Sequence, residues 1–200
     1  MLQLMKNSDT AIIVLHEIYG VNEHMKNFCQ SLFEYEFDVF CPNLLGTETV
    51  FDYSQEETAY QYFVEKVGFD KASSTIKNLI SDMKDNYKEL FIIGFSVGAT
   101  TAWLCSEEES IQAIVGYYGS RIRNYINITP KCPTLLFFPE KEKSFNVDAL
   151  MTSLETMNAE SQKFNGNHGF SDPYSANYNK GSAQETFNLM IDFISNHSTN

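Results

Sequence analysis

The sequence predicts an α/β protein built on a single doubly wound, mostly parallel β-sheet with helices on both faces. Short apolar runs of strand length alternate with longer segments whose apolar residues recur at helical spacing, as in consecutive βαβ units. Several runs are continuous and rich in β-branched residues, as expected of strands buried on both faces. The 200 residues contain no internal repeat and no linker-like stretch, so we expect one domain over residues 1–200.

Two strands and three helices are predicted in the first half of the chain. Asn22 precedes the first helix, where its side-chain oxygen can accept a hydrogen bond from the free N–H groups of the helix start. Residues 43–53 are expected to be irregular. The elements are a strand at 11–15, a helix with an apolar stripe from Met25 to Phe33, a strand at 37–41, a helix at about 54–67 and a clearer helix at about 70–86.

Four strands and three helices are predicted in the second half. The last helix has a distinct apolar face, formed by Phe187, Met190, Ile191 and Ile194. The elements are strands at 89–93, 111–117, 134–138 and, more weakly, 160–164, and helices at 97–105, about 147–157 and about 183–195.

The acidic composition argues against two classes of partner. Asp and Glu number 26 against 14 Lys and Arg, which gives a formal net charge of −12. Such a surface repels both the phosphates of nucleic acid and an anionic membrane, so neither partner is expected. Residues 1–17 have neither the basic start nor the cleavage site of a signal peptide, and no run reaches the roughly 18 apolar residues of a membrane span. We therefore expect a cytoplasmic protein.

No cofactor or metal is expected. The four cysteines, Cys29, Cys41, Cys105 and Cys132, are scattered without a C-x-x-C pair, and we expect them to be buried, reduced thiols. The segment 16–20 (HEIYG) lacks the second histidine of an H-E-x-x-H zinc motif, and the sequence has no dinucleotide or phosphate-binding glycine motif.

The strongest chemical signal is the segment 94–98, with the sequence Gly-Phe-Ser-Val-Gly. It ends a buried strand and opens a helix, which is the context of a G-x-S-x-G nucleophile elbow. At such a turn the serine takes a strained, positive φ and its hydroxyl projects from the sheet, while the two glycines leave room for the reversal. The helix start also offers free N–H groups to an oxyanion. Ser96 is therefore predicted to be a nucleophile.

His168 is the predicted general base. His16 and His24 precede the serine and His197 lies near the end of the chain, whereas His168 follows the elbow in a loop with glycines on both sides. This position fits the chain order serine, acid, histidine of such hydrolases.

The third member of the triad must be an acid that holds the imidazole in the correct tautomer. The strand at 134–138 is followed by Pro-Glu-Lys-Glu-Lys, and Asp148 lies just beyond. Glu142 is the first choice, Glu140 the second and Asp148 the third. The alternative is that this stretch is only a solvated run of charges.

Four blocks of sequence together resemble the dienelactone hydrolase family. Residues 11–46 look like its opening block of strand, H/Q-E-I-x-G-V-N, helix and strand. GFSVGAT is similar to the family's elbow, GYYG to the end of its next strand and NHGF to its histidine loop. The blocks keep the same order over about residues 10–195.

The resemblance implies an α/β-hydrolase fold without a large cap, and it implies roles for further residues. The backbone N–H groups of Ile18 and Val97 are expected to form the oxyanion hole. Glu17 is expected beside Ser96, and Tyr118, in the GYYG block, is expected near the site.

The chain departs from the family pattern at three positions. The namesake enzymes have a cysteine nucleophile, whereas this chain has Ser96. They carry Asp where the aligned stretch here places Glu142. They also hold the substrate carboxylate with an arginine shortly after the histidine, where this chain has Ser171 and Asp172. Dienelactone itself is therefore not the expected substrate.

The expected function is hydrolysis of small carboxylic esters, thioesters or lactones through a Ser-His-acid triad and an acyl-enzyme. Two alternatives remain open: a catalytically weak or inactive binding module of the same fold, and an acyltransferase with the same triad. Arg121 and Arg123 are interpreted as surface charges, with anion binding at the site mouth as the alternative. The aromatic residues between 51 and 63 are interpreted as core packing, with a pocket roof as the alternative. The oligomeric state is not predicted.

Overall fold

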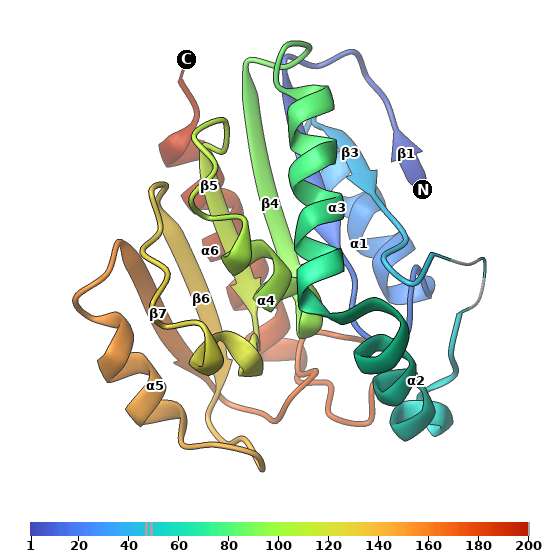
Figure 1. The fold of residues 1–200 in the computed structure, drawn as a ribbon, viewed down its shortest axis with the longest axis vertical. Helices are drawn as coiled ribbons and strands as arrows, with labels where there is room; N and C mark the ends of the chain where they lie inside the picture. The colour runs from blue at the N-terminus through green and yellow to red at the C-terminus, as the bar shows by residue number, and fades with distance from the viewer. Residues whose placement is uncertain (47, 49, 200) are drawn as a thin grey trace.

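The computed structural model describes residues 1–46, 48 and 50–199, and its strands form one seven-stranded sheet with the order β1-β3-β2-β4-β5-β6-β7. All neighbours from β3 to β7 pair in parallel, and only the described edge strand β1 runs antiparallel, against β3. The predicted mostly parallel sheet is therefore confirmed (Figure 1). The strands are β1 (Leu2–Leu4), β2 (Thr10–Leu15), β3 (Asp38–Cys41), β4 (Glu89–Phe95), β5 (Ala113–Tyr117), β6 (Thr134–Pro139) and β7 (Ala159–Phe164).

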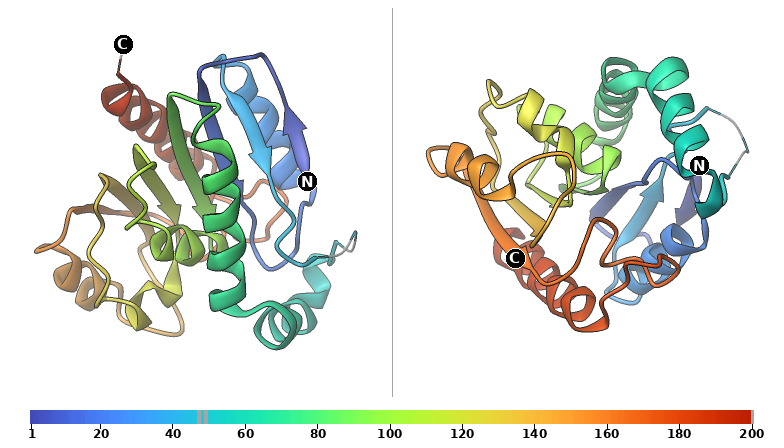
Figure 2. Two further views of the ribbon diagram at one scale, coloured as in Figure 1. Left: turned by 45° about the horizontal axis from the view of Figure 1, so that its top comes forward. Right: turned by 90° about the horizontal axis from the view of Figure 1, so that it is seen from below.

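Helices cover both faces of the sheet. Figure 2 shows α1 and α6 on one side, with α3, α4 and α5 on the other. The α-helices are α1 (Glu23–Phe33), α2 (Glu56–Tyr62), α3 (Gly68–Met83), α4 (Val97–Leu104), α5 (Val147–Leu154) and α6 (Lys180–His197). None of the helices in the described parts of the chain is both long and apolar enough to cross a bilayer.

The central strand β2 shows why its sequence is a continuous apolar run. Ile12 and Val14 pack into the cluster that contains the apolar faces of α1 and α6. Ile13 and Leu15 pack into the cluster on the opposite face, with residues of α3 and α4. Because both faces of the strand are covered, the residues that point to either face are equally buried from Ala11 to Leu15, and none of these five is polar. All four cysteines are free and buried, as expected.

The order of the strands places a crevice between β2 and β4. The chain leaves β2 through α1 toward β3 on one side, and later strands continue through β4 to β7 on the other side. Ligands of open α/β sheets bind where the winding reverses in this way, at the carboxyl ends of the strands. Leu15 pairs with Gly94 in this sheet, so the segments that follow β2 and β4 emerge side by side.

Some elements differ from those predicted. The three-residue strand β1 was not predicted, because it is too short to show a periodic pattern. The helix predicted at 54–67 consists of a 3₁₀ turn (Tyr53–Gln55), α2 and a π-helical segment (Phe63–Val67). It joins α3 at Gly68, whose positive φ of 68° accounts for the break. A further 3₁₀ turn (Ser120–Asn124) follows β5.

Candidate active site

Ser96 lies at a sharp turn between the end of β4 and the start of α4. Its φ and ψ are 53° and −111°, a conformation that non-glycine residues seldom adopt. A Cβ atom on Gly94 would collide with the backbone of Gly98, and one on Gly98 would collide with the carbonyl of Leu15. The glycines are thus required by close backbone approach, and the turn has the geometry of a nucleophile elbow.

His168 connects Ser96 to Glu142. Its Nε2 lies 2.8 Å from Ser96 Oγ, and its Nδ1 lies 2.6 Å from Glu142 Oε1. The carboxylate can only accept, so Nδ1 carries the proton and Nε2 is free to accept from the serine hydroxyl. The Asn177 side chain donates to the His168 carbonyl at 2.8 Å, which holds the loop between β7 and α6.

The three acids considered for the triad have different surroundings. The Glu142 side chain is 7% exposed and faces the imidazole. Glu140 is exposed to solvent, and Asp148 pairs with Lys163 at 2.5 Å on the protein surface. The structure thus brings Glu142 to His168, and it places Asp148 in a separate ion pair.

The pKa of His168 is raised above its usual 6.5. Burial disfavours the imidazolium, but the hydrogen bond and the charge of Glu142 outweigh burial, with smaller contributions from Glu17 and Glu56. The surroundings therefore favour an imidazolium, which is the form the ring takes after it accepts a proton.

His16 shapes the turn that carries Ile18, a role that no local sequence pattern indicates. The imidazole is fully buried, with Nδ1 2.5 Å from the Glu17 carbonyl and Nε2 2.8 Å from the Leu44 N–H. Nδ1 must donate and Nε2 must accept, so the ring is neutral, and burial lowers its pKa to about 4. Ile18 and Val97 line the same pocket as Ser96. The N–H of Val97 belongs to the first turn of α4, which has no internal acceptor.

Glu17 and Tyr118 border the pair formed by Ser96 and His168. Glu17 is 6% exposed and lines the pocket. Burial, and then the nearby charge of Asp172, raise the Glu17 pKa to about 7. The Tyr118 ring lies 4.9 Å from the His168 ring, and its hydroxyl is 2.9 Å from Ser171 Oγ. The structure thus places Glu17 in the wall of the pocket and the Tyr118 ring against His168.

Asp172 is a buried member of the site whose contacts sequence reasoning missed. Oδ2 accepts a hydrogen bond from the Tyr53 hydroxyl at 2.5 Å, and Oδ1 accepts one from the Tyr174 N–H at 2.8 Å. His24 Nδ1 lies 3.6 Å from Oδ2. The donor atoms of Glu17, His24 and Asp172 lie within 4.8 Å of one another, so these three side chains could hold a metal ion.

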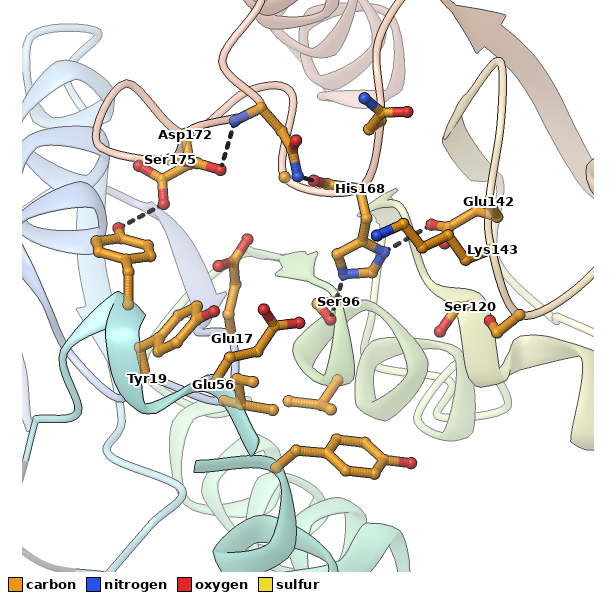
Figure 3. Close-up of a pocket in the computed structure, with 18 of the residues that line it drawn as sticks. Glu17, Tyr19, Glu56, Ser96, Ser120, Glu142, Lys143, His168, Asp172 and Ser175 are labelled. Carbon is orange, nitrogen blue, oxygen red and sulfur yellow. Dashed lines mark hydrogen bonds and ion pairs between the residues drawn. The ribbon is translucent and has the colours of Figure 1, made fainter. Parts of the chain in front are cut away.

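A pocket of about 600 Å³ lies above the carboxyl ends of β2 and β4, and its lining includes Glu17, Ser96, Glu142, His168 and Asp172 (Figure 3). Its wall contains Tyr53 and Tyr60, whereas Phe63 is fully buried in the core, so the aromatic segment contributes to both pocket and packing. Arg121 lines the pocket and donates to the Tyr60 hydroxyl. Arg123 instead lies over the Phe145 ring, 5.0 Å from its centroid.

The parallel sheet, the elbow after β4 and the histidine loop before α6 define the α/β-hydrolase fold. The model of the dienelactone hydrolase family matches residues 2–198, and the chain belongs to that family. Family membership indicates a hydrolase that acts on lactone or ester substrates.

Relatives of known sequence cover nearly the whole chain. The uncharacterized protein YczH of Bacillus subtilis (strain 168) is 39% identical over 90% of this chain and 89% of its own length. A Yersinia pestis protein described provisionally as a carboxymethylenebutenolidase is 25% identical over 93% of this chain and 78% of its own.

A solved structure supports the fold assignment. The crystal structure of a protein from Klebsiella pneumoniae subsp. pneumoniae MGH 78578, described provisionally as a dienelactone hydrolase, superposes with a TM-score of 0.78. The superposition covers 95% of this chain and 89% of that one at 21% identity, so it shows a common fold.

Proposed function

We propose that the protein hydrolyses small carboxylic esters, including thioesters and lactones, with Ser96 as nucleophile. One observation carries the proposal: the continuous contact of Ser96 Oγ, His168 and Glu142, at 2.8 Å and 2.6 Å. A hydroxyl becomes an effective nucleophile when an adjacent base takes its proton and a third group orients that base. The contact with Glu142 favours a hydrolase over an inactive binding module, because the module was considered for the case in which no acid contacts His168.

Acylation begins when Ser96 Oγ attacks the ester carbonyl and its proton passes to His168 Nε2. The carbonyl oxygen becomes an oxyanion that accepts hydrogen bonds from the Ile18 and Val97 N–H groups, and Glu142 stabilises the imidazolium. The tetrahedral intermediate collapses, His168 returns the proton to the leaving alcohol, and an acyl-serine remains. Water then gives its proton to His168 and attacks the acyl group, which regenerates Ser96 and releases the acid.

The volume of the pocket and the description of a relative both support a small ester or lactone as substrate. A volume of about 600 Å³ accommodates a small ester or lactone. The provisional description of the Yersinia relative names a butenolide lactone, and opening a lactone follows the same steps with the leaving alcohol still attached. Ser171 and Asp172 stand where the namesake enzymes carry the arginine that holds a substrate carboxylate, so we do not propose their substrate for this chain.

The test combines covalent labelling with turnover. A fluorophosphonate probe should label wild-type protein at Ser96, and p-nitrophenyl esters of graded chain length should be hydrolysed. Ser96→Ala should remove labelling and lower kcat/KM at least about a thousandfold, and His168→Ala should label poorly. Ser120→Ala is the matched control, because Ser120 lines the same pocket. Labelling that persists in Ser96→Ala, or turnover equal to that of wild type, would refute the proposal.

A further inference from the structure

Most of the carboxyl groups that line the pocket lie on one side of it. Figure 3 shows Glu17, Glu56, Tyr19 and Asp172 on one side of the pair Ser96 and His168, with Lys143 and Glu142 on the other side. The carboxylates of the first group come from the segment after β2, the start of α2 and the loop before α6. They converge only in the folded chain, and the mechanism proposed above uses none of them.

Two of these carboxyl groups are buried and, among the described residues, form no ion pair with a Lys or Arg side chain. Glu17 is 6% exposed and Asp172 is fully buried. Glu17 Oε1 is without a hydrogen-bond partner in the described chain, and the Glu17 side chain lines the pocket. The imidazole of His24 lies beside them, with its Nδ1 3.6 Å from Asp172 Oδ2. An unpaired buried carboxylate is costly, so a positive group that enters the pocket here gains a strong electrostatic partner.

Aromatic rings complete this side of the pocket. Tyr19 and Tyr53 both line it, with ring centroids 4.7 Å apart at 51°. Tilted tyrosine faces beside carboxylates form the surroundings that attract ammonium groups through cation–π and charge interactions.

The cationic side chains of the pocket are positioned elsewhere. Arg121 donates to the Tyr60 hydroxyl and lies 5.7 Å from the centre of the Tyr60 ring. Lys141 and Lys143 flank the triad acid Glu142 in the stretch after β6. The acidic side therefore has space and charge for a cation that the protein itself does not supply.

We propose that the acidic side of the pocket, formed by Glu17, Tyr19, Tyr53, Glu56 and Asp172, binds a cationic ammonium group of the ester substrate. The inference rests on the proposed ester hydrolysis, and it specifies the substrate class. Such a substrate carries a quaternary or protonated amine within a few bonds of the ester carbonyl. The formal net charge of −12 further attracts it to the protein from solution.

The test compares esters that differ only in charge. Acetylcholine and its neutral isostere 3,3-dimethylbutyl acetate place the group in the alcohol. The ethyl esters of trimethylammonioacetate and 3,3-dimethylbutanoate place it in the acyl part. In at least one pair, wild-type kcat/KM should favour the cation by about tenfold after correction for the rates of spontaneous hydrolysis.

Variants assign this preference to the acidic side. Glu56→Gln removes one exposed carboxylate, and Asp172→Asn removes the buried one; each should lower the preference severalfold while the neutral isostere is still hydrolysed. Glu65→Gln is the control, since Glu65 is an exposed carboxylate in the neighbouring π-helical segment. A neutral isostere that is hydrolysed as well as the cation in both pairs, or an unchanged preference in both variants, would overturn the proposal.

Direct binding separates this proposal from the hydrolase proposal. Calorimetry with phenyltrimethylammonium on Ser96→Ala should show binding that weakens in the double variant Ser96→Ala/Glu56→Gln. If binding occurs but no ester is hydrolysed, the ammonium site stands and the hydrolase proposal falls. If esters are hydrolysed but the probe does not bind, the ammonium site falls.

The metal content of the purified protein gives a further test. If wild-type protein holds one equivalent of a divalent metal and His24→Ala does not, the ammonium proposal is overturned, because the metal would neutralise the same carboxylates.

Discussion

Glu142 Oε1 lies 2.6 Å from His168 Nδ1, although Glu140 stands only two positions earlier in the chain and is exposed to solvent. This difference in position makes the two glutamates a matched pair. Glu142→Gln keeps the size of the side chain but removes the charge that stabilises the imidazolium. We expect kcat/KM for a p-nitrophenyl ester to fall by about a hundredfold or more, while Glu140→Gln stays within about twofold of wild type. Equal losses in both variants would contradict the assignment of Glu142.

The pH profile should follow the raised pKa of His168. The base must be neutral to accept a proton from Ser96, so kcat/KM should fall as the pH drops through a pKa above 6.5. In Glu142→Gln the amide oxygen can still accept from Nδ1, but the charge that strengthens this hydrogen bond and raises the His168 pKa is lost, so the acid limb should move to lower pH. Rates measured from about pH 5 to 9 provide the check. An acid limb that does not move would contradict the role of Glu142.

The ionisation of Glu17 should be visible in protein stability. Its pKa rises from 4.5 to about 7 on folding, so between these values the folded state keeps a proton that the unfolded state loses. The free energy of unfolding should therefore decrease as the pH rises through this window, by about 3 kcal/mol in total at 1.36 kcal/mol per pKa unit. Above about pH 7 the loss is complete.

Glu17→Gln tests this linkage, because glutamine resembles the protonated carboxyl and does not titrate. The difference in unfolding free energy between the variant and wild type should grow from about pH 4.5 to 7 in urea titrations. His16 and His24, whose pKa values are lowered to about 4, act in the opposite direction. They are present in both proteins, so their direct contribution largely cancels in the difference. A constant difference across the window would contradict the prediction.

The close approach at the elbow predicts a large effect from a single methyl group. Gly98→Ala places Cβ against the carbonyl of Leu15, and neither backbone can move without disturbing β2 or α4. We expect the variant to lose more than about 3 kcal/mol of stability or to fail to fold. Gly181→Ala is the control in the first turn of α6, where the nearest atom to the added Cβ is 3.5 Å away. Similar denaturation midpoints for the two variants would contradict this account.

The sharp turn at Ser96 and the place of His168 beside it could be predicted because their signals are local. Gly94, Ser96 and Gly98 are fixed by the steric demands of one turn between a recognisable strand and helix. His168 is the histidine that follows the elbow in a loop, and chain order selects it. The parallel sheet was predictable for a similar reason, since strands such as β2 are apolar at every position after the first residue, Thr10.

Other parts of the site depend on tertiary contacts that no local pattern records. Which acid reaches His168 depends on the path of the loop after β6, so Glu140 and Glu142 were equivalent in kind. The contact of Tyr53 with Asp172 joins residues 119 positions apart. The hydrogen bond from the Leu44 N–H to His16 Nε2 joins residues far apart in the sequence, so it could not be predicted without knowing where Leu44 lies. The strand β1 was missed because pairing with β3, rather than its own pattern, makes it a strand.

The burial of all four cysteine thiols has a consequence for the chemical robustness of the protein. Burial raises the pKa of Cys105 to about 12 and that of Cys132 to about 11, so thiolate, the form attacked by peroxide and alkylating agents, is scarce. If the hydroxyl of Ser96 is the nucleophile, as proposed, we expect turnover to survive iodoacetamide or hydrogen peroxide at concentrations that inactivate relatives with a cysteine nucleophile. An oxidising environment would then leave this hydrolase working.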